Sequence, residues 1–209
     1  MTTIGLKIKR VLDYLDKILP NAHCELNYNK DYELLIAIML SAQTTDKRVN
    51  EVTDKLFKKY KSLDRLSEAN IDDLKEIIYP LGTYTKKSLN VKNIALKLKN
   101  IGYVPNDRKF LESLDGVGRK STNLALSILY NEACFAVDTH VERITKRLGL
   151  VNKNDHVLAI EKKMLKKIPA YRVGKTHHQF VLFGRYYCKA KNPLCDDCEL
   201  KDICKHKST

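Results

Sequence analysis

A lysine and an aspartate in the second half of the chain are the residues with the clearest chemical potential. Lys120 ends the run Leu-Asp-Gly-Val-Gly-Arg-Lys at residues 114–120, and Asp138 lies in the segment that follows. A lysine amine near another cation, near the positive end of a helix dipole and between partly dry walls has its neutral form favoured. A neutral amine can attack a sugar carbon and form a Schiff base. Lys120 and Asp138 are therefore candidate catalytic residues, although a solvated lysine is the ordinary alternative.

The glycines before Lys120 are expected in a hairpin between two helices. Asp107 can cap a short first helix, and apolar residues from Ser121 onward recur with helical period. Glycine permits positive φ and close approach to a ligand, and the unpaired N–H groups at the start of the second helix favour an anion. A plain turn between packed helices would also explain the glycines. The candidate phosphate-binding residues of the hairpin are Leu114, Gly116, Val117, Gly118 and Arg119.

A further helix is expected directly after Val137. Asp138 and Thr139 are both residue types that cap helices, and Thr139 with Glu142 has the spacing of a capping box. Position alone therefore does not decide whether Asp138 is a cap or a catalytic carboxylate.

Four of the six cysteines lie close together near the C-terminal end, with the spacing C-x6-C-x2-C-x5-C. Disulfides need an oxidising compartment, and the chain shows no export signal, so a metal centre is favoured. Four thiolates suit a tetrahedral zinc ion and equally a 4Fe–4S cluster, although zinc sites more often pair two short Cys-x2-Cys knuckles. The candidate metal ligands are Cys188, Cys195, Cys198 and Cys204. His177 and His178 are poor joint ligands, because neighbouring helix positions point about 100° apart.

The elements that must position these residues are predicted to be helices, because apolar residues recur with helical period and no segment alternates convincingly as a strand. The helix near residues 86–99 is expected to turn Leu89, Ile94, Ala95 and Leu98 inward. The fold class is therefore all-α. Helices are predicted at about residues 4–18, 31–40, 49–60, 71–79, 86–99, 121–129, 139–148, 155–168 and 172–187.

The net charge of +13 over 209 residues implies a polyanionic partner, and DNA, RNA and an anionic membrane surface all fit that sign. Lys189 and Lys191, which lie between the first two cysteines, could contact phosphates, although an ordinary solvated loop explains them too. The chain shows no long apolar run and no signal peptide. We therefore expect a cytoplasmic, nucleoid-associated protein that does not enter a membrane.

The hairpin at residues 114–120, followed by Val-Asp-Thr-His-Val at residues 137–141, resembles the helix-hairpin-helix signature of the DNA glycosylase superfamily. Within that superfamily the chain resembles the endonuclease III family, bifunctional enzymes that act on oxidised pyrimidines. The resemblance implies that Lys120 is the nucleophile and Asp138 the essential aspartate. One departure is Asp115, where the family usually has proline. An acidic side chain beside a phosphate site is expected to weaken the grip on DNA.

The resemblance covers nearly the whole chain and extends to the other candidate residues. It implies a 4Fe–4S cluster on the four cysteines, and a glutamine, Gln43, that enters the duplex where a base has been expelled. Read alone, residues 41–46 would be a capping turn. The loop at residues 81–84 approaches DNA in the family, although a plain helix–helix turn fits it equally well. The implied DNA contacts outside the hairpin and the cysteine loop are Gln43, Gly82, Tyr84 and His140.

The same resemblance implies two helical lobes with DNA bound in the groove between them. One is a six-helix block at residues 22–133, which carries the helix-hairpin-helix. The other combines residues 1–21 with residues 134–209 and ends in the cluster loop at residues 188–204. The implied partner is duplex DNA that contains damaged pyrimidines or abasic sites, and the protein is expected to be a monomer.

Three alternatives stay open from sequence. An adenine-mismatch glycosylase of the same superfamily shares the cysteine spacing and Asp138 but typically lacks the hairpin lysine, which is Lys120 here. A non-catalytic DNA-binding module could use the hairpin and a zinc-pinned tail. A basic RNA-binding protein has less support, because no aromatic stacking platform is apparent.

Overall fold

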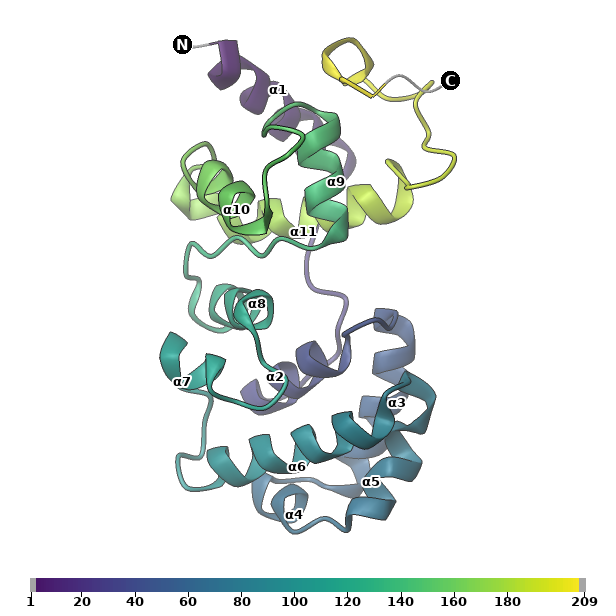
Figure 1. Ribbon diagram of the computed structural model, residues 1–209, viewed down its shortest axis with the longest axis vertical. Coiled ribbons are helices and arrows are strands. Elements are labelled where there is room, and N and C mark those ends of the chain that lie inside the picture. Colours follow the sequence, from purple (N-terminus) through teal and green to yellow (C-terminus); the bar gives the residue numbers. More distant parts are fainter. Residues whose placement is uncertain (1–2, 207–209) are drawn as a thin grey trace. The chain divides into compact units, whose positions relative to one another are not determined.

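The protein, seen in a computed structural model that describes residues 3–206, is built from helices, and these residues contain no strand. The all-α prediction is confirmed. The chain divides into two compact units (Figure 1). The continuous unit holds residues 25–130, and the split unit combines residues 1–24 with residues 131–209, of which 1–2 and 207–209 lie outside the described part. None of the helices within residues 3–206 is both long and apolar enough to cross a bilayer.

The continuous unit is organised around a buried helix. Every residue of α2 from Tyr32 to Leu40 is buried, because the helix packs against α3, α6 and α8. The helix predicted at about residues 31–40 is confirmed. The helices of this unit are α2 (Asp31–Leu40), α3 (Asp46–Lys59), α4 (Leu63–Ser67), α5 (Ile71–Ile78), α6 (Tyr84–Lys99), α7 (Arg108–Glu112) and α8 (Arg119–Tyr130), with a 3-10 turn, η1 (Tyr79–Leu81), before α6.

One helix of the continuous unit has no counterpart in the sequence prediction. The five-residue α4 begins after Ser62, whose hydroxyl accepts a hydrogen bond from the amide of Arg65, and it packs on α6. Five residues are too few to show a helical period. The unit, all of whose residues are described, therefore has seven α-helices, two of which, α4 and α7, span five residues each.

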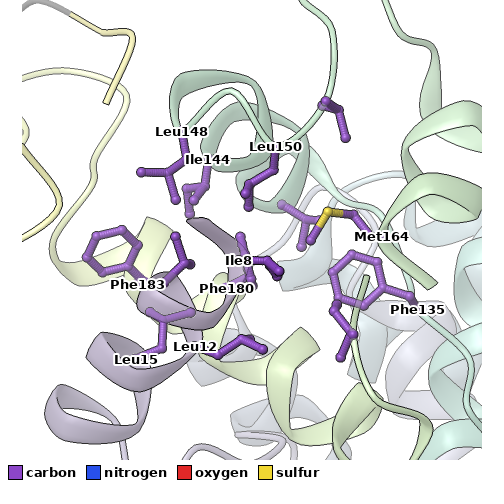
Figure 2. Close-up of a cluster of buried hydrophobic side chains, with 14 of the residues drawn as sticks. Ile8, Leu12, Leu15, Phe135, Ile144, Leu148, Leu150, Met164, Phe180 and Phe183 are labelled. Atoms are coloured by element: carbon purple, nitrogen blue, oxygen red, sulfur yellow. The ribbon is translucent and has the colours of Figure 1, made fainter. Parts of the chain in front are cut away.

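The split unit has its own apolar core. Figure 2 shows Ile8, Leu12 and Leu15 of α1 packed among side chains from α9 and α11, with Phe135 and Met164 in the same cluster. The helix predicted at about residues 4–18 is confirmed, and these three residues of it are buried. The helices of this unit are α1 (Thr3–Ile18), α9 (Thr139–Arg147), α10 (Val157–Leu165) and α11 (Val173–Tyr186), with 3-10 turns η2 (Ala170–Arg172) and η3 (Lys201–Ile203).

The predicted start of α9 is confirmed, whereas that of α10 is wrong in detail. Helix α9 begins at Thr139 and its N-cap is Asp138, which has an extended backbone and whose carboxylate accepts a hydrogen bond from the amide of Val141. The N-cap of α10 is His156. Asp155, the predicted start, instead accepts hydrogen bonds from the Asn152 amide at 2.8 Å and the Lys163 amine at 2.6 Å.

Helix α6 buries the predicted face except at one position. Ile94, Ala95 and Leu98 are buried as expected, but Leu89 is 47% exposed while Lys87 is only 4% exposed. The prediction of an inward Leu89 is therefore wrong. It failed because apolar residue type was used as the only sign of burial, and α6 buries a lysine that has hydrogen-bond partners.

A polar face of α6 holds the predicted hairpin. Lys97 Nζ donates to the carbonyl oxygen of Ser113 at 2.9 Å. Asn93 Nδ2 donates to Asp115 Oδ2 at 2.5 Å, and Lys97 Nζ lies 3.9 Å from Asp115 Oδ1. Gly116 has φ +78°, and a Cβ there would lie 2.3 Å from Asn90 Nδ2. The carboxylate of Asp115 is thus bound by α6, so its charge is partly compensated within the protein.

We expect Gly116→Ala to destabilise the protein much more than Gly118→Ala. A left-handed backbone at a non-glycine residue costs about 1–2 kcal/mol, and the new methyl group at position 116 must also displace the Asn90 side chain. Gly118 has no positive φ, and a Cβ there would meet nothing within 4 Å. Urea unfolding of both variants is the measurement, and Gly118→Ala should stay within about 0.5 kcal/mol of wild type. Equal losses would contradict the described hairpin geometry.

The adjacent histidines of α11 have structural positions. His177 is buried, and its Nδ1 lies 2.9 Å from the carbonyl oxygen of Ala136. The two imidazole rings have centroids 5.1 Å apart. Burial, with added effects of His177 and His23, lowers the pKa of His178 from 6.5 to about 3.

This pKa shift predicts an acid-dependent loss of stability. The unfolded chain protonates His178 as the pH falls through 6.5, whereas the folded chain keeps it neutral until about pH 3. The free energy of unfolding should be highest above pH 6.5 and fall by up to about 1.4 kcal/mol per pH unit below it. Urea unfolding of wild type and His178→Gln between pH 4 and pH 8 tests this. The difference in the free energy of unfolding at pH 8, where His178 is neutral in both states, gives the effect of the substitution on packing alone. A difference between the two proteins that does not change with pH would refute the assignment.

Candidate functional site

The hairpin that carries Lys120 has the predicted helix–turn–helix form. Asp107 caps α7, its Oδ1 accepting from the amides of Lys109 at 2.8 Å and Phe110 at 3.1 Å. Leu114 and Val117 are buried and anchor the turn, and the amide of Val117 donates to the Leu114 carbonyl oxygen at 3.1 Å. The turn is therefore fixed by packing on one side, while its glycines stay exposed on the other.

Lys120 is exposed and is the second residue of α8. Arg119 precedes it, and the first N–H groups of a helix have no partners within the helix. The Thr122 amide already donates to the Gly118 carbonyl oxygen at 2.9 Å, so α8 is helical from its first turn. The amine thus lies next to a surface on which backbone N–H groups and a guanidinium favour an anion such as a phosphate.

Asp138, the second candidate, belongs to the split unit, whereas Lys120 belongs to the continuous unit. Its side chain is half-buried, and Oδ1 accepts a hydrogen bond from the amide of Val141 at 2.8 Å. This bond uses one oxygen of the carboxylate. Capping and catalysis therefore do not compete for the same atom, and the cap holds the side chain in one orientation.

His140 is the second residue of α9 and is half-buried. Arg143 Nη2 is 3.2 Å from its Nδ1, and a Cβ at Gly184 of α11 would lie 2.8 Å from the Cβ of His140. Burial lowers the pKa of His140, while the carboxylate of Asp138 acts in the opposite direction. His140 thus packs at the contact between α9 and α11, a structural position that sequence alone did not reveal.

The structure brings together the two polar turns that contain Gln43 and Gly82. The hydroxyl of Thr44 donates to the Leu81 carbonyl oxygen at 2.9 Å. Gln43 is exposed with φ +57°, and the second turn is also left-handed, with φ +67° at Gly82 and +43° at Thr83. Two predicted DNA contacts that are far apart in the sequence therefore belong to one surface.

Tyr84 begins α6 next to this surface. Its ring centroid lies 4.9 Å from that of Tyr79, whose side chain is 65% exposed. Tyr79 was not among the DNA contacts predicted from sequence. An aromatic residue beside a Gly-containing loop in a strongly basic chain could have indicated it as a candidate.

The four C-terminal cysteines line one cavity of about 690 Å³ in the split unit. None of them is in a disulfide, and burial raises the pKa of the thiols of Cys198 and Cys204. Apolar side chains such as Tyr14 and Phe183 form part of the wall, and charged side chains such as Asp197 and Lys201 line it as well. Among residues 3–206, no three His, Cys, Asp or Glu side chains converge on a single metal ion. The four thiols line one space, which suits the donor set of an iron–sulfur cluster.

Arginines of α9 hold the loop that carries the first of these cysteines. Arg147 Nη1 donates to the carbonyl oxygen of Lys189 at 2.7 Å and lies 3.4 Å from Cys188 Sγ. Arg143 Nη2 donates to the carbonyl oxygen of Cys188 at 3.1 Å. The side chains of Lys189 and Lys191 are exposed on this loop, so they are available to an anionic partner.

Comparison with known proteins identifies two family matches. Residues 36–170 match the HhH-GPD superfamily base excision DNA repair proteins. Residues 188–204 match the iron–sulfur binding domain of endonuclease III, and this range contains all four cysteines. The C-terminal segment is therefore an iron–sulfur binding domain.

Relatives and solved structures agree with these matches. The chain is 40% identical to endonuclease III of Bacillus subtilis (strain 168), over 96% of this chain and 94% of that protein. It is 38% identical to endonuclease III of Escherichia coli (strain K12), over 96% and 97% of the two chains. A non-covalent endonuclease III–DNA complex has a similar fold, with a TM-score of 0.93 and 42% identity over 98% of this chain and 96% of that one.

A trapped endonuclease III–DNA covalent intermediate gives a TM-score of 0.92 at 42% identity, over 98% of this chain and 97% of that one. With the identities above, these matches show the family. The chain belongs to the endonuclease III family of the HhH-GPD superfamily and is a base-excision DNA glycosylase and lyase.

Proposed function

We propose that this enzyme removes oxidised pyrimidines from duplex DNA and cuts the resulting abasic strand, with Lys120 as its nucleophile. The observation that carries the proposal is an exposed amine at the start of α8, directly after a hairpin that α6 holds in place. We further propose that the two compact units are the two lobes that act on DNA, and that the enzyme works as a monomer in the cytoplasm, at the nucleoid.

The chemistry follows from the two candidate residues. The uncharged amine of Lys120 attacks C1′ of the deoxyribose as the damaged base leaves, and ionised Asp138 stabilises the positive charge that develops on the sugar. The C1′–O4′ bond of the resulting aminal then breaks, its electron pair going to O4′, and the opened sugar is held as a Schiff base that acidifies the C2′ position. Loss of a C2′ proton then expels the 3′ phosphate by β-elimination, which breaks the strand.

DNA binding uses backbone and basic groups that the fold leaves exposed. The hairpin at residues 114–119, Lys189 and Lys191 contact phosphates, while Gln43, Gly82 and Tyr84 meet the duplex at the expelled base. An amide at position 43 can both donate to and accept from the orphaned partner base. Endonuclease III has been solved on DNA in the two complexes described above, which supports this use of the same fold.

The cysteine loop holds a 4Fe–4S cluster through Cys188, Cys195, Cys198 and Cys204. A cluster bound by these four thiolates would cross-link the loop that carries Lys189 and Lys191. Neither base release nor β-elimination transfers an electron. Arg147 and Arg143 hold the carbonyl oxygens of this loop against α9. The cluster therefore supports DNA positioning rather than the bond-breaking steps.

Borohydride trapping tests the nucleophile. Wild type incubated with a duplex that carries thymine glycol or an abasic site should become cross-linked to DNA when the Schiff base is reduced. We expect Lys120→Gln to lose this cross-link, because an amide cannot form a Schiff base, whereas Lys109→Gln on α7 should keep it. A Lys120→Gln protein that still cross-links would overturn the assignment.

The same assay separates the two roles of Asp138. Asparagine is as good an N-cap as aspartate, so Asp138→Asn removes the charge and keeps the cap. We expect it to slow base release strongly, with little change in DNA affinity or unfolding temperature. Asp138→Ala should in addition lose about 1 kcal/mol of stability. Unchanged base release in Asp138→Asn would show that the carboxylate only caps α9.

Iron analysis tests the cluster. We expect wild type to contain iron and to show broad visible absorbance, and Cys195→Ser to lose both, because a ligand is removed. Cys24→Ser should retain both, since Cys24 lies outside the matched range. Zinc in place of iron in the purified wild type would contradict the cluster.

A further inference from the structure

Lys87 is a buried lysine between the two turns that contain Gln43 and Gly82. Its side chain is 4% exposed. Its Nζ donates to the carbonyl oxygens of Ala42 and Leu81, each at 3.0 Å, and to Thr44 Oγ1 at 3.2 Å. The amine therefore joins both turns to α6.

Each hydrogen-bond donor of this amine has an acceptor. A lysine ammonium has three donors and no acceptor, and three acceptors surround Nζ here. All three are uncharged, and burial alone lowers the pKa of Lys87. A buried cation without such partners would be strongly disfavoured. Moving either turn away would leave a donor unpaired, so the amine resists their separation.

The acceptors flank a backbone that would not hold its conformation by itself. Ala42 and Thr44 are the two neighbours of Gln43, which is left-handed at φ +57°. A non-glycine residue keeps this backbone conformation only when contacts with the surrounding structure hold it there. The Thr44 hydroxyl adds a bond to Leu81, the other acceptor of Lys87. Lys87 and Thr44 together hold Gln43 outward.

We propose that Lys87 is a positioning residue: it clamps the Gln43 turn to the Leu81–Gly82 turn, so that Gln43 enters the duplex in one preset conformation. This inference rests on the proposed role of Gln43 in filling the gap left by the expelled base. Lys87 itself touches no reacting atom. Its effect on catalysis must therefore pass through the two turns that it holds, and the proposal assigns that effect to Gln43.

Hydrogen exchange measures the clamp without reference to activity. We expect Lys87→Met to speed amide exchange in residues 41–45 and 81–84, where the Thr44 and Gly82 amides bond within their turns, and to leave α3 and α5 unchanged. Thr44→Val is a milder variant that removes only the shared hydroxyl, and it should act on the same amides. Lys86→Met, which changes an exposed lysine of the same helix, is the matched control. Exchange in both turns equal to that of the control would overturn the clamp.

A double-mutant cycle measures the coupling. On a thymine glycol duplex, we expect Lys87→Met to lower kcat/KM on the order of 10- to 100-fold, the size of effect that a misplaced group produces. In a Gln43→Ala background, Lys87→Met should lower kcat/KM no more than about twofold. The two substitutions are then non-additive, because both act through the same side chain. The proposal would be overturned if the fold-loss in kcat/KM of the double variant equalled the product of the fold-losses of the two single variants. If wild type itself proved inactive, the proposed function would fail, while the exchange experiment would still decide the clamp.

Discussion

The continuous unit depends on one polar stripe along α6. Lys87, Asn90, Asn93 and Lys97 recur at spacings that place them on one side of the helix. Lys87 binds the two turns, and the other three support the hairpin through direct hydrogen bonds or close packing. Where a helix packs on an apolar core, its buried polar groups must find hydrogen-bond partners. Each segment with a proposed DNA contact in this unit is therefore fixed to the same rigid element.

The segments held by this stripe contain several residues with a left-handed backbone. Gln43, Gly82, Thr83 and Gly116 all have positive φ, and all lie in the segments that α6 holds. Glycine adopts this conformation freely, but a residue with a side chain pays about 1–2 kcal/mol. The hydrogen bonds from α6 and Thr44 offset that cost. The result is a surface whose exposed groups have one orientation before any partner arrives.

In the split unit one helix links the catalytic candidate to the cysteine loop. Asp138 caps the first turn of α9, and Arg143 and Arg147 of the same helix donate to the carbonyl oxygens of Cys188 and Lys189. The position of the carboxylate and that of the loop are therefore set by one rigid element.

The sequence by itself determined the features that local pattern encodes. Helical periodicity predicted the all-α fold, and the Gly-Val-Gly turn before Lys120 predicted the hairpin. The cysteine spacing predicted a metal centre, and the resemblance to the endonuclease III family favoured iron–sulfur over zinc. Only the tertiary structure decided which side chains serve these motifs. In the folded protein Lys87 is buried and Leu89, which was expected to be buried, is exposed. The side chain of Asn93 donates a hydrogen bond to Asp115. Periodicity reports one helix at a time, whereas the partners of Lys87 lie as far as 45 residues away in the chain, so only folding brings them together.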